Sequence, residues 1–236
     1  MATLVLTALG TAIGGPLGGA IGGLIGSQID HVVLGAGSHR EGPRLKELGV
    51  STSSYGSAIP RHHGRMRVPG TIVWATDLVE HKATAGGGKG SPSMTSYSYS
   101  VSFAVALSSR PIQHVGRVWA DGNLLRGAAG DLKAGGAMRI YTGHGDQPLD
   151  PLIASAEPTC PAFRGLAYCV FEALALADFG NRIPALTFEL IADDGEVTIE
   201  ALLEPLTDPL TVARPLHGLQ GFSNEGGALS QTLASI

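Results

Sequence analysis

The pattern of apolar and polar residues divides the chain into an N-terminal apolar segment and a longer region with strand-like alternation. No charged side chain occurs between Ala2 and Gln28, and the stretch Leu4–Gly26 is apolar or small throughout. As a single helix this stretch would extend for about 33 Å, because each residue adds about 1.5 Å. From Val68 onward the period shifts toward two, which is typical of strands. The pattern predicts one N-terminal helix followed by a β-rich body.

Strand signals recur through this body, and the clearest is Ser96–Leu107, where Tyr, Val, Phe and Leu alternate with Ser or Ala. A Gly-rich loop, Ala83–Ser93, is expected to join two long antiparallel strands, and Asp121-Gly122 predicts a hairpin turn. Helix signals are sparse in the body. The expected strands are Thr71–Thr76, Ser96–Leu107, Val115–Trp119, Met138–Tyr141, Ala167–Ala175 and Ala185–Ala192, and the expected short helices are Pro148–Ala156 and Ile199–Leu206.

Glycines recur with a helical period in the N-terminal segment. The glycines at every fourth position are Gly10, Gly14, Gly18, Gly22 and Gly26, and Gly15, Gly19 and Gly23 follow one position later. In a helix these residues form one slowly drifting stripe without side chains, where another helix can approach closely. We interpret the stripe as a helix-packing surface, and we expect Gly14, Gly18 and Gly22 to form the contact between copies of the chain.

Three interpretations of this apolar segment compete. A secretory signal peptide lacks support because no basic residue precedes the apolar run. A transmembrane anchor has the necessary length, but eight glycines and Pro16 make a weak autonomous helix. The preferred interpretation is a helix that is stabilised by symmetry-related copies or by a partner chain, which leaves open whether the segment enters a membrane transiently.

Composition narrows the classes of function. An apolar share of 44% can supply a hydrophobic core, and a net charge of -4 argues against a protein that coats nucleic acid. The two cysteines, Cys160 and Cys169, could form a disulfide, half a metal site or two unrelated buried thiols, and we favour buried thiols.

The segment after the apolar run predicts an exposed arm. Gly35–Gly49 mixes glycine, proline and basic residues, and Arg61–Arg67 is expected to be a basic loop. Adjacent His62 and His63 would point to opposite faces of a strand, so they could not easily bind one metal. The C-terminal residues resemble the start of a helix, and we expect a fragment or the ordered front portion of a longer polypeptide. The expected organisation is a helix at 1–31, a linker arm at 32–66, a β-rich domain at 67–194 and the start of a second, small domain at 195–236.

Motifs for catalysis are missing from the sequence. The loop Ala85–Ser91 superficially resembles a phosphate-binding loop, but Gly90 separates Lys89 from Ser91, so the motif fails. No G-x-S-x-G or H-E-x-x-H pattern occurs, and the acidic residues Asp193, Asp194 and Glu196 are expected to be solvated in a turn. We expect no enzymatic activity, no cofactor and no metal.

Several segments, in this order, resemble the N-terminal part of phage tail-tip hub proteins, including the large baseplate hub, or megatron, of gene transfer agents. The segments that carry the resemblance are Tyr55–Pro60, Arg67–Trp74, Tyr141–Gly143, Gln147–Ile153, Ala162–Tyr168 and Asp178–Pro184. The resemblance covers roughly Gly49 to Ala192, and its most specific part is the run from Phe163 to Pro184.

This resemblance implies a mainly β (α+β) fold, with a tail-tube-like β-barrel hub domain behind the glycine-zipper helix. It also implies a homotrimer at the tail tip (baseplate) of a virion or virus-like particle, closing the tail tube for DNA delivery. The implied partners are distal tail protein, the C-terminus of the tape-measure protein and other hub or fibre proteins, without sequence-specific nucleic acid binding. The alternative hypothesis is a membrane-active, pore-forming protein that inserts its N-terminal helix into a host membrane.

Overall fold

The computed structural model describes residues 2–33, 40–41, 58–85, 93–203 and 218–225. Its helices are α1 (Ala2–Val33), α2 (Pro151–Ala156), η1 (Ala177–Phe179) and α3 (Ile199–Leu203). Its strands are β1 (Arg40–Glu41), β2 (Arg61–Pro69), β3 (Thr71–Ala75), β4 (Val79–Ala85), β5 (Met94–Ser108), β6 (His114–Ala120), β7 (Asn123–Arg126), β8 (Ala137–Tyr141), β9 (Ala167–Ala175), β10 (Leu186–Ile191) and β11 (Gly221–Asn224). Strand therefore predominates over helix, which confirms the predicted mainly β class.

Two compact units divide the chain. The first unit comprises residues 1–46 and 80–98, and the second comprises residues 47–79 and 99–236. Strand β5 contributes residues 94–98 to the first unit and residues 99–108 to the second. Each unit is described by itself below.

The first unit contains α1, β1, most of β4 and the start of β5. The two-residue strand β1 runs parallel to β5, with Arg40 opposite Met94. Strand β4 also pairs with β5, and the Thr84 and Thr95 hydroxyl oxygens lie 3.2 Å apart. The sequence pattern did not indicate β4, because all of its side chains are exposed and no apolar alternation marks it.

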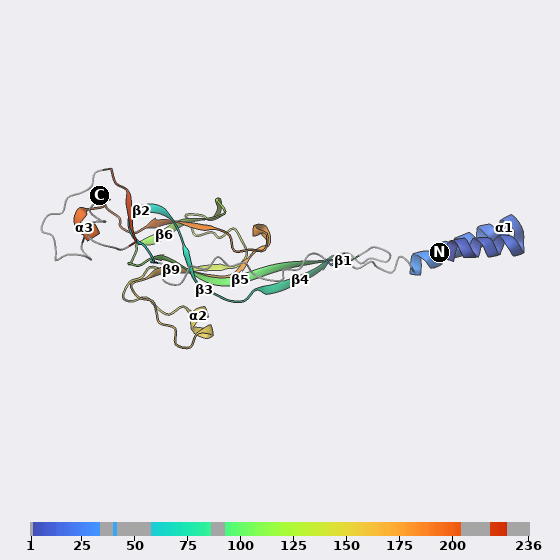
Figure 1. The fold of residues 1–236 in the computed structure, drawn as a ribbon, viewed down its shortest axis with the longest axis horizontal. Coiled ribbons are helices and arrows are strands. Elements are labelled where there is room, and N and C mark those ends of the chain that lie inside the picture. Colours follow the sequence, from blue (N-terminus) through green and yellow to red (C-terminus); the bar gives the residue numbers. More distant parts are fainter. Residues whose placement is uncertain (1, 34–39, 42–57, 86–92, 204–217, 226–236) are drawn as a thin grey trace. The chain divides into compact units, whose positions relative to one another are not determined.

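Two β-sheets form the second unit (Figure 1). One sheet places β5 between β3 and β9, with β8 beyond β9, and all of these pairs are antiparallel. The other sheet has the order β11-β2-β10-β6-β7 and is also antiparallel. The strands expected from Val115, Met138, Ala167 and Ala185 are confirmed as β6, β8, β9 and β10.

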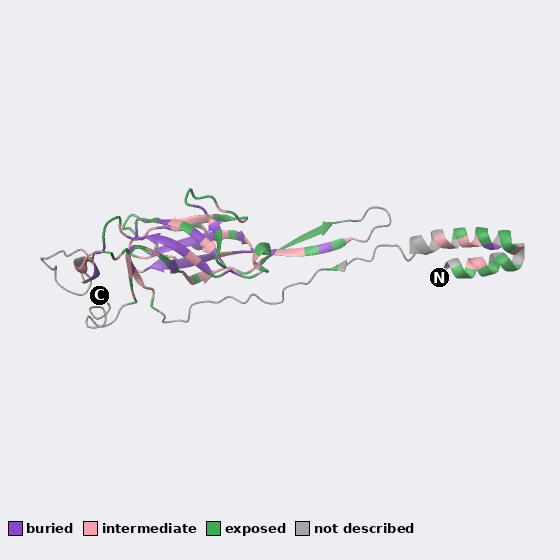
Figure 2. Cartoon of the chain, turned by 90° about the horizontal axis from the view of Figure 1, so that it is seen from above, coloured by how far each residue is buried: buried purple, intermediate pink, exposed green. Residues whose placement is uncertain are grey.

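The core lies where these two sheets meet, and Figure 2 shows buried residues concentrated on their strands. Phe103 and Phe171 stack with ring centroids 4.9 Å apart, and Phe188 of the other sheet is fully buried. The chain passes from β2 to β3 at Gly70, where a Cβ atom would overlap Val105 and lie 2.7 Å from the Phe188 ring. Glycine is needed there because side chains of both sheets occupy the space that a Cβ would fill.

Turn chemistry follows the sequence closely between β6 and β7. Asp121 and Gly122 both have positive φ, at 48° and 85°, as a two-residue hairpin turn requires. The Asp121 carboxylate also accepts hydrogen bonds from Arg182 at 2.8 Å and from the Ala185 backbone at 3.0 Å. The turn is thereby attached to the start of β10.

One expectation about the polar segments needs correction. Arg61–Arg67 was expected to be a loop, but it lies in β2, where His62 and His63 are buried. Pairing along the whole strand accounts for this, because β11 pairs with residues 61–64 of β2 and β10 pairs with residues 65–69. Strand β2 also crosses the expected linker boundary at residues 66 and 67. Strand β11, from the segment expected to begin a second domain, pairs with β2.

The remaining expectations are confirmed in part or lie outside the described residues. The two short helices are present as α2 and α3, although residues 204–206 of the second prediction are not described. Lys89 and the C-terminal residues 227–236 also lie outside the described part of the chain. Both cysteines are free thiols; Cys169 is buried as predicted, whereas Cys160 is half-buried.

Candidate functional site

The N-terminal apolar segment folds as a helical hairpin rather than as one straight helix. Gly15 has φ +58°, and Pro16 follows as the first residue of the second arm. Glycine in the left-handed region ends a helix readily, and proline suits the first helical position, so Gly15-Pro16 reverses the chain. Figures 1 and 2 both show α1 doubling back on itself, and we call residues 2–33 the α1 hairpin.

Glycines of the second arm lie against the first arm of the same hairpin. A Cβ atom on Gly22 would overlap the Leu6 carbonyl oxygen and lie 2.9 Å from the Leu6 carbonyl carbon. A Cβ on Gly23 would lie 3.0 Å from the Thr7 hydroxyl. Gly22 therefore makes a close helix contact, and the described contact is with its own chain. The stripe contains four more glycines of α1 whose contacts the structure does not describe: Gly10, Gly14, Gly18 and Gly26. The contact of these glycines with other copies of the chain stays a prediction.

Large aliphatic side chains cover the outer faces of the α1 hairpin. Each of them is more than half exposed: Leu4, Val5, Leu9, Leu17, Ile21, Leu24 and Ile25. An apolar surface of this kind is typical of a segment that is covered by another protein or by lipid. Among the described helices, none combines the length and hydropathy that crossing a bilayer requires.

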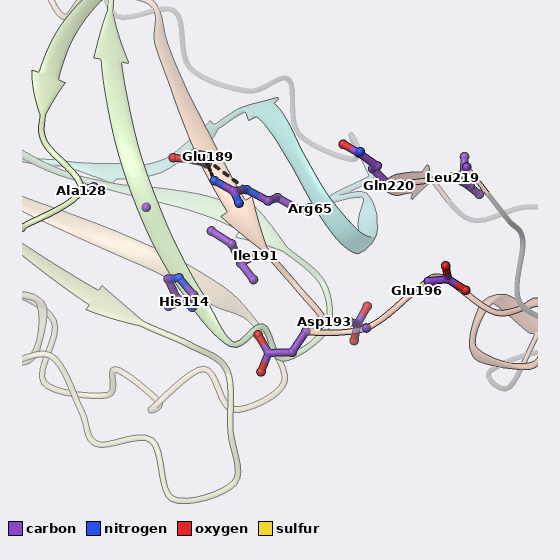
Figure 3. A pocket seen from close by; sticks show the side chains of 13 residues that line it. Arg65, His114, Ala128, Glu189, Ile191, Asp193, Glu196, Leu219 and Gln220 are labelled. Carbon is purple, nitrogen blue, oxygen red and sulfur yellow. Dashed lines mark hydrogen bonds and ion pairs between the residues drawn. The ribbon is translucent and has the colours of Figure 1, made fainter.

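Glu189 organises the charges on the second sheet, beside a cleft of about 930 Å³ (Figure 3). Its carboxylate accepts hydrogen bonds from Arg117 at 2.8 Å and from Arg65, which joins it in an ion pair. These bonds, first from Arg117 and then from Arg65, hold the pKa of Glu189 well below its usual range. Gly116 leaves room for this carboxylate, since a Cβ there would lie 2.7 Å from Glu189 Oε2.

A second carboxylate, Asp193, fixes the end of β10. Arg110 binds it through both Nη atoms, at 2.9 Å and 2.8 Å, and the Gly64 backbone N–H donates at 3.0 Å. Burial alone would raise the pKa of Asp193, but the bonds from Arg110 and the Gly64 backbone, together with the nearby positive charge, outweigh burial and lower it. Burial, with Arg110 nearby, lowers the pKa of His63 to about 4, so the imidazole is neutral at pH 7. Asp193 is thus committed to an ion pair, contrary to the expectation of a solvated turn.

Two arginines stack on Trp119 on the same sheet, a feature that the sequence did not indicate. The Arg67 guanidinium carbon lies 4.1 Å from the Trp119 ring centroid, and that of Arg117 lies 5.5 Å away. Arg67 is held by a 2.8 Å hydrogen bond from its Nε to the Thr187 hydroxyl. Tryptophan and arginine are enriched in the parts of protein interfaces that dominate affinity. We call Arg67, Trp119 and Arg117 the arginine–tryptophan stack.

Asp150 forms the most buried charged centre of the second unit. It is 0% exposed and accepts from Arg139 Nε at 2.7 Å and from the Tyr141 hydroxyl at 2.8 Å. It also caps α2 by accepting from the Leu152 and Ile153 backbone N–H groups. Burial alone would raise the pKa of Asp150, but the bond from Arg139 and the others outweigh burial and lower it.

An apolar cavity of about 470 Å³ lies beside α2 in the same unit. Trp74 and Ala104 of the first sheet line it, together with Cys160 and Phe163 of the loop before β9. Tyr168 also lines the cavity; its ring stacks on Tyr141 at 4.6 Å and meets Phe163 edge-on at 5.7 Å. The Tyr168 hydroxyl is buried and has no hydrogen-bond partner in the described structure.

These groups form structural networks more readily than a catalytic centre. Glu189, Asp193 and Asp150 each accept from arginine and backbone donors, so none is left to act as a free base. In the part of the chain that the structure describes, no three His, Cys, Asp or Glu side chains are grouped to hold a metal ion. Among the described residues, the features open to an outside partner include the α1 hairpin, the arginine–tryptophan stack, the apolar cavity and the cleft beside Glu189.

Comparison with known proteins identifies one solved structure of interest. The chain is 39% identical, over 84% of its length, to a chain in a structure described as the virion of a native gene transfer agent particle. The TM-score is 0.45, and the match spans only 41% of the longer chain. No protein-family model matches the sequence, and no curated protein matches it. The similarity is one of sequence.

Proposed function

We propose that this chain is a structural component of a phage-like particle of the gene transfer agent kind. The observation that carries the proposal is the 39% sequence identity, over 84% of the chain, to a protein of a gene transfer agent virion. The two-sheet body is consistent with a structural component of a particle, because its buried charged groups form networks of ion pairs and hydrogen bonds that join one strand to another. The same similarity supports a non-enzymatic role as part of this proposal.

Within the particle, we propose that the chain belongs to the hub of the tail tip. In this role three copies close the tail tube and link the distal tail protein to the fibre or receptor-binding region during DNA delivery. The motif order from Tyr55 to Pro184 supports this position, and so does the uncharged α1 hairpin, whose exposed aliphatic side chains need a covering partner. The end of the tape-measure protein is a further candidate neighbour of the hairpin.

A deletion experiment tests the hub role. Cells that produce the particles should, without this gene, make capsids whose tails are absent or incomplete at the tip, and gene transfer should fall to background. Restoring the gene on a plasmid should restore both. Complete, transfer-competent particles from the deletion strain would refute the proposal. The native mass of the purified chain checks the number of copies, for which the proposal expects a multiple of three.

A pore-forming role is the second candidate, and the exposed aliphatic faces of the α1 hairpin favour it. The hairpin has no charged residue between Ala2 and Gln28, so its arms can enter lipid at low electrostatic cost. Liposome leakage separates the two roles. Dye release by the full chain, abolished by deleting residues 2–33, would support pore formation, whereas intact liposomes together with assembly into particles would support the hub.

A further inference from the structure

The outer face of the second sheet carries a row of apolar side chains. Thr187 of β10 lies opposite Pro69 of β2 and opposite Trp119 of β6, and Trp119 in turn lies opposite Leu124 of β7. Residues directly opposite in an antiparallel pair point to the same side of the sheet. Phe188, the next residue of β10, is fully buried in the core, so the row points away from the core. Pro69 and Leu124 are exposed and Trp119 is half-buried, which leaves this apolar row open to a partner.

Three arginines lie beside the apolar row. Arg65 and Arg67 are alternate residues of β2, and Arg65 and Arg117 both donate to the Glu189 carboxylate (Figure 3). The side chains of Arg65 and Arg117 are 63% and 48% exposed, and Arg67 is exposed as well. The group therefore has an excess of positive charge, although the whole chain has a net charge of -4. We call the following set, which includes the arginine–tryptophan stack, the arginine face: Arg65, Arg67, Arg117, Glu189, Trp119 and Leu124.

Arg67 is held in a fixed position but has no carboxylate partner. Its Nε donates to the Thr187 hydroxyl at 2.8 Å, and its guanidinium carbon lies 4.1 Å from the Trp119 ring centroid. Within the described part of the chain, its two Nη groups make no hydrogen bond or ion pair. An arginine fork binds a carboxylate through two parallel hydrogen bonds, and a side chain that is already fixed loses less entropy on binding. The geometry of Arg67 therefore favours a carboxylate as the group that binds to it.

The chemistry of the arginine face favours an acidic protein over a nucleic acid. Glu189 lies between Arg65 and Arg117, so it interrupts the run of positive charge that a phosphate backbone needs. The Trp119 ring already packs against Arg67 and Arg117, whereas stacking on a base requires an open aromatic face. Tryptophan and arginine are enriched among the residues that dominate the affinity of protein interfaces. A carboxylate beside an apolar side chain matches both the charge and the apolar row of this face.

We propose that the arginine face binds an acidic surface of a different polypeptide in the same particle. A carboxylate of that polypeptide accepts two hydrogen bonds from the Nη groups of Arg67. A neighbouring apolar side chain of the same polypeptide packs against Trp119 and Leu124. The proposal rests on the proposed function, because that function supplies a particle in which the chain meets other polypeptides.

Photo-crosslinking in assembled particles identifies the partner. A p-benzoylphenylalanine at Leu124 should give an adduct with a different polypeptide, and peptide mass spectrometry should find Asp or Glu close to the adduct site. The same residue at Leu149, which is 48% exposed in the loop before α2, is the matched control and should not give this adduct. An adduct with a second copy of the chain, with the same chain or with nucleic acid would overturn the inference. The same holds for an identical adduct from Leu149, and for no adduct in particles that contain the chain. Particles that lack the chain altogether would refute the proposed function itself.

Substitutions in the full chain then test the charge, with the affinity for the crosslinked partner as the measurement. Leu124→Glu and Leu124→Lys remove the same exposed side chain, and Leu124→Glu should bind an acidic partner about 10-fold more weakly than Leu124→Lys. Arg67→Lys keeps the charge but loses the fork, so it should weaken binding by about 10-fold. Arg164→Lys, in the exposed loop before β9, should leave the affinity unchanged. Equal affinities of the two Leu124 variants would overturn the acidic partner, and an unchanged affinity of Arg67→Lys would overturn the role of the Arg67 fork.

Discussion

Removal of the Asp150 carboxylate should destabilise the second unit strongly. In Asp150→Ala, Arg139 loses its buried partner, the Tyr141 hydroxyl loses its acceptor, and α2 loses its cap. Breaking a buried ion pair costs about 3–5 kcal/mol, and Arg139, which is 29% exposed, favours the lower part of that range. A loss of about 3–4 kcal/mol corresponds to a fall in Tm of roughly 6–16 °C for a chain of this size.

Thermal unfolding followed by tryptophan fluorescence measures this effect, with Asp146→Ala as the control. Asp146 is exposed and lies four residues before Asp150 in the same loop, so its replacement should leave Tm nearly unchanged. Asp150→Asn keeps an acceptor for the helix cap but loses the charge, and should fall between the two. A Tm for Asp150→Ala equal to that of the control would refute the energetic role assigned to this centre.

The pH dependence gives an independent check on the same residue. The pKa of Asp150 is lower in the folded chain than in the unfolded chain, so its contribution is fully present above pH about 4 and is lost as the pH falls below that value. The difference in Tm between the wild type and Asp150→Ala should therefore shrink below pH 4. A difference that grows on acidification would contradict the assigned ion pair.

Three further substitutions test other parts of the structure. Gly22→Val should separate the arms of the α1 hairpin and speed its amide hydrogen exchange, whereas Ala20→Val on the exposed side should not. His63, whose pKa is lowered to about 4, is expected to reduce the stability of the fold as the pH falls from about 6.5 toward 4. His63→Asn should remove this loss of stability, and the control substitution His114→Asn should not. Gly70→Ala should lower stability by about 1–3 kcal/mol in urea unfolding, because its Cβ would overlap Val105.

Each of these predictions has a contradicting result. Unchanged exchange in Gly22→Val would mean that the arms do not touch at this glycine. A pH profile in His63→Asn that matches the wild type would place the titrating group elsewhere. A Gly70→Ala variant as stable as the wild type would mean that the two sheets have room for a side chain where the chain crosses between them.

The strands of the body could be predicted from the sequence because they are rich in β-branched and aromatic residues and, in β5, large apolar side chains recur at every second position. In β5 the large side chains Tyr99, Val101 and Phe103 are buried at every second position, and the small residues Ser100 and Ala104 between them are buried as well. Asp121-Gly122 likewise specified its own turn through the positive φ that both residues tolerate. The local sequence alone was sufficient to predict β5 and this turn.

The elements that the sequence missed depend on partners far along the chain. Strand β2 contains two histidines and three arginines, and it became a strand because β11 pairs with its first half and β10 pairs with its second half. The ion pairs of Glu189 join residues 72 and 124 positions apart, which no local pattern reveals. The cavity similarly draws its wall from residues between Ile59 and Tyr168.

The reversal of the N-terminal segment could have been found in the sequence. Glycine followed by proline, Gly15-Pro16, is the combination that ends one helix and starts another. The regular four-residue spacing of glycines, however, favoured one continuous stripe. The hairpin changes the interpretation of that stripe, because Gly22 lies at the contact between the two arms. The exposed aliphatic outer faces remain available to a partner.

The position of the chain within a purified particle tests the central claim most directly. A short epitope inserted at the exposed loop residues Gly145 and Asp146 would allow antibody-gold labelling in electron micrographs. The account predicts gold at the end of the tail that is farthest from the capsid. Gold distributed over the capsid, or particles that carry no label while the tagged chain is expressed, would contradict it.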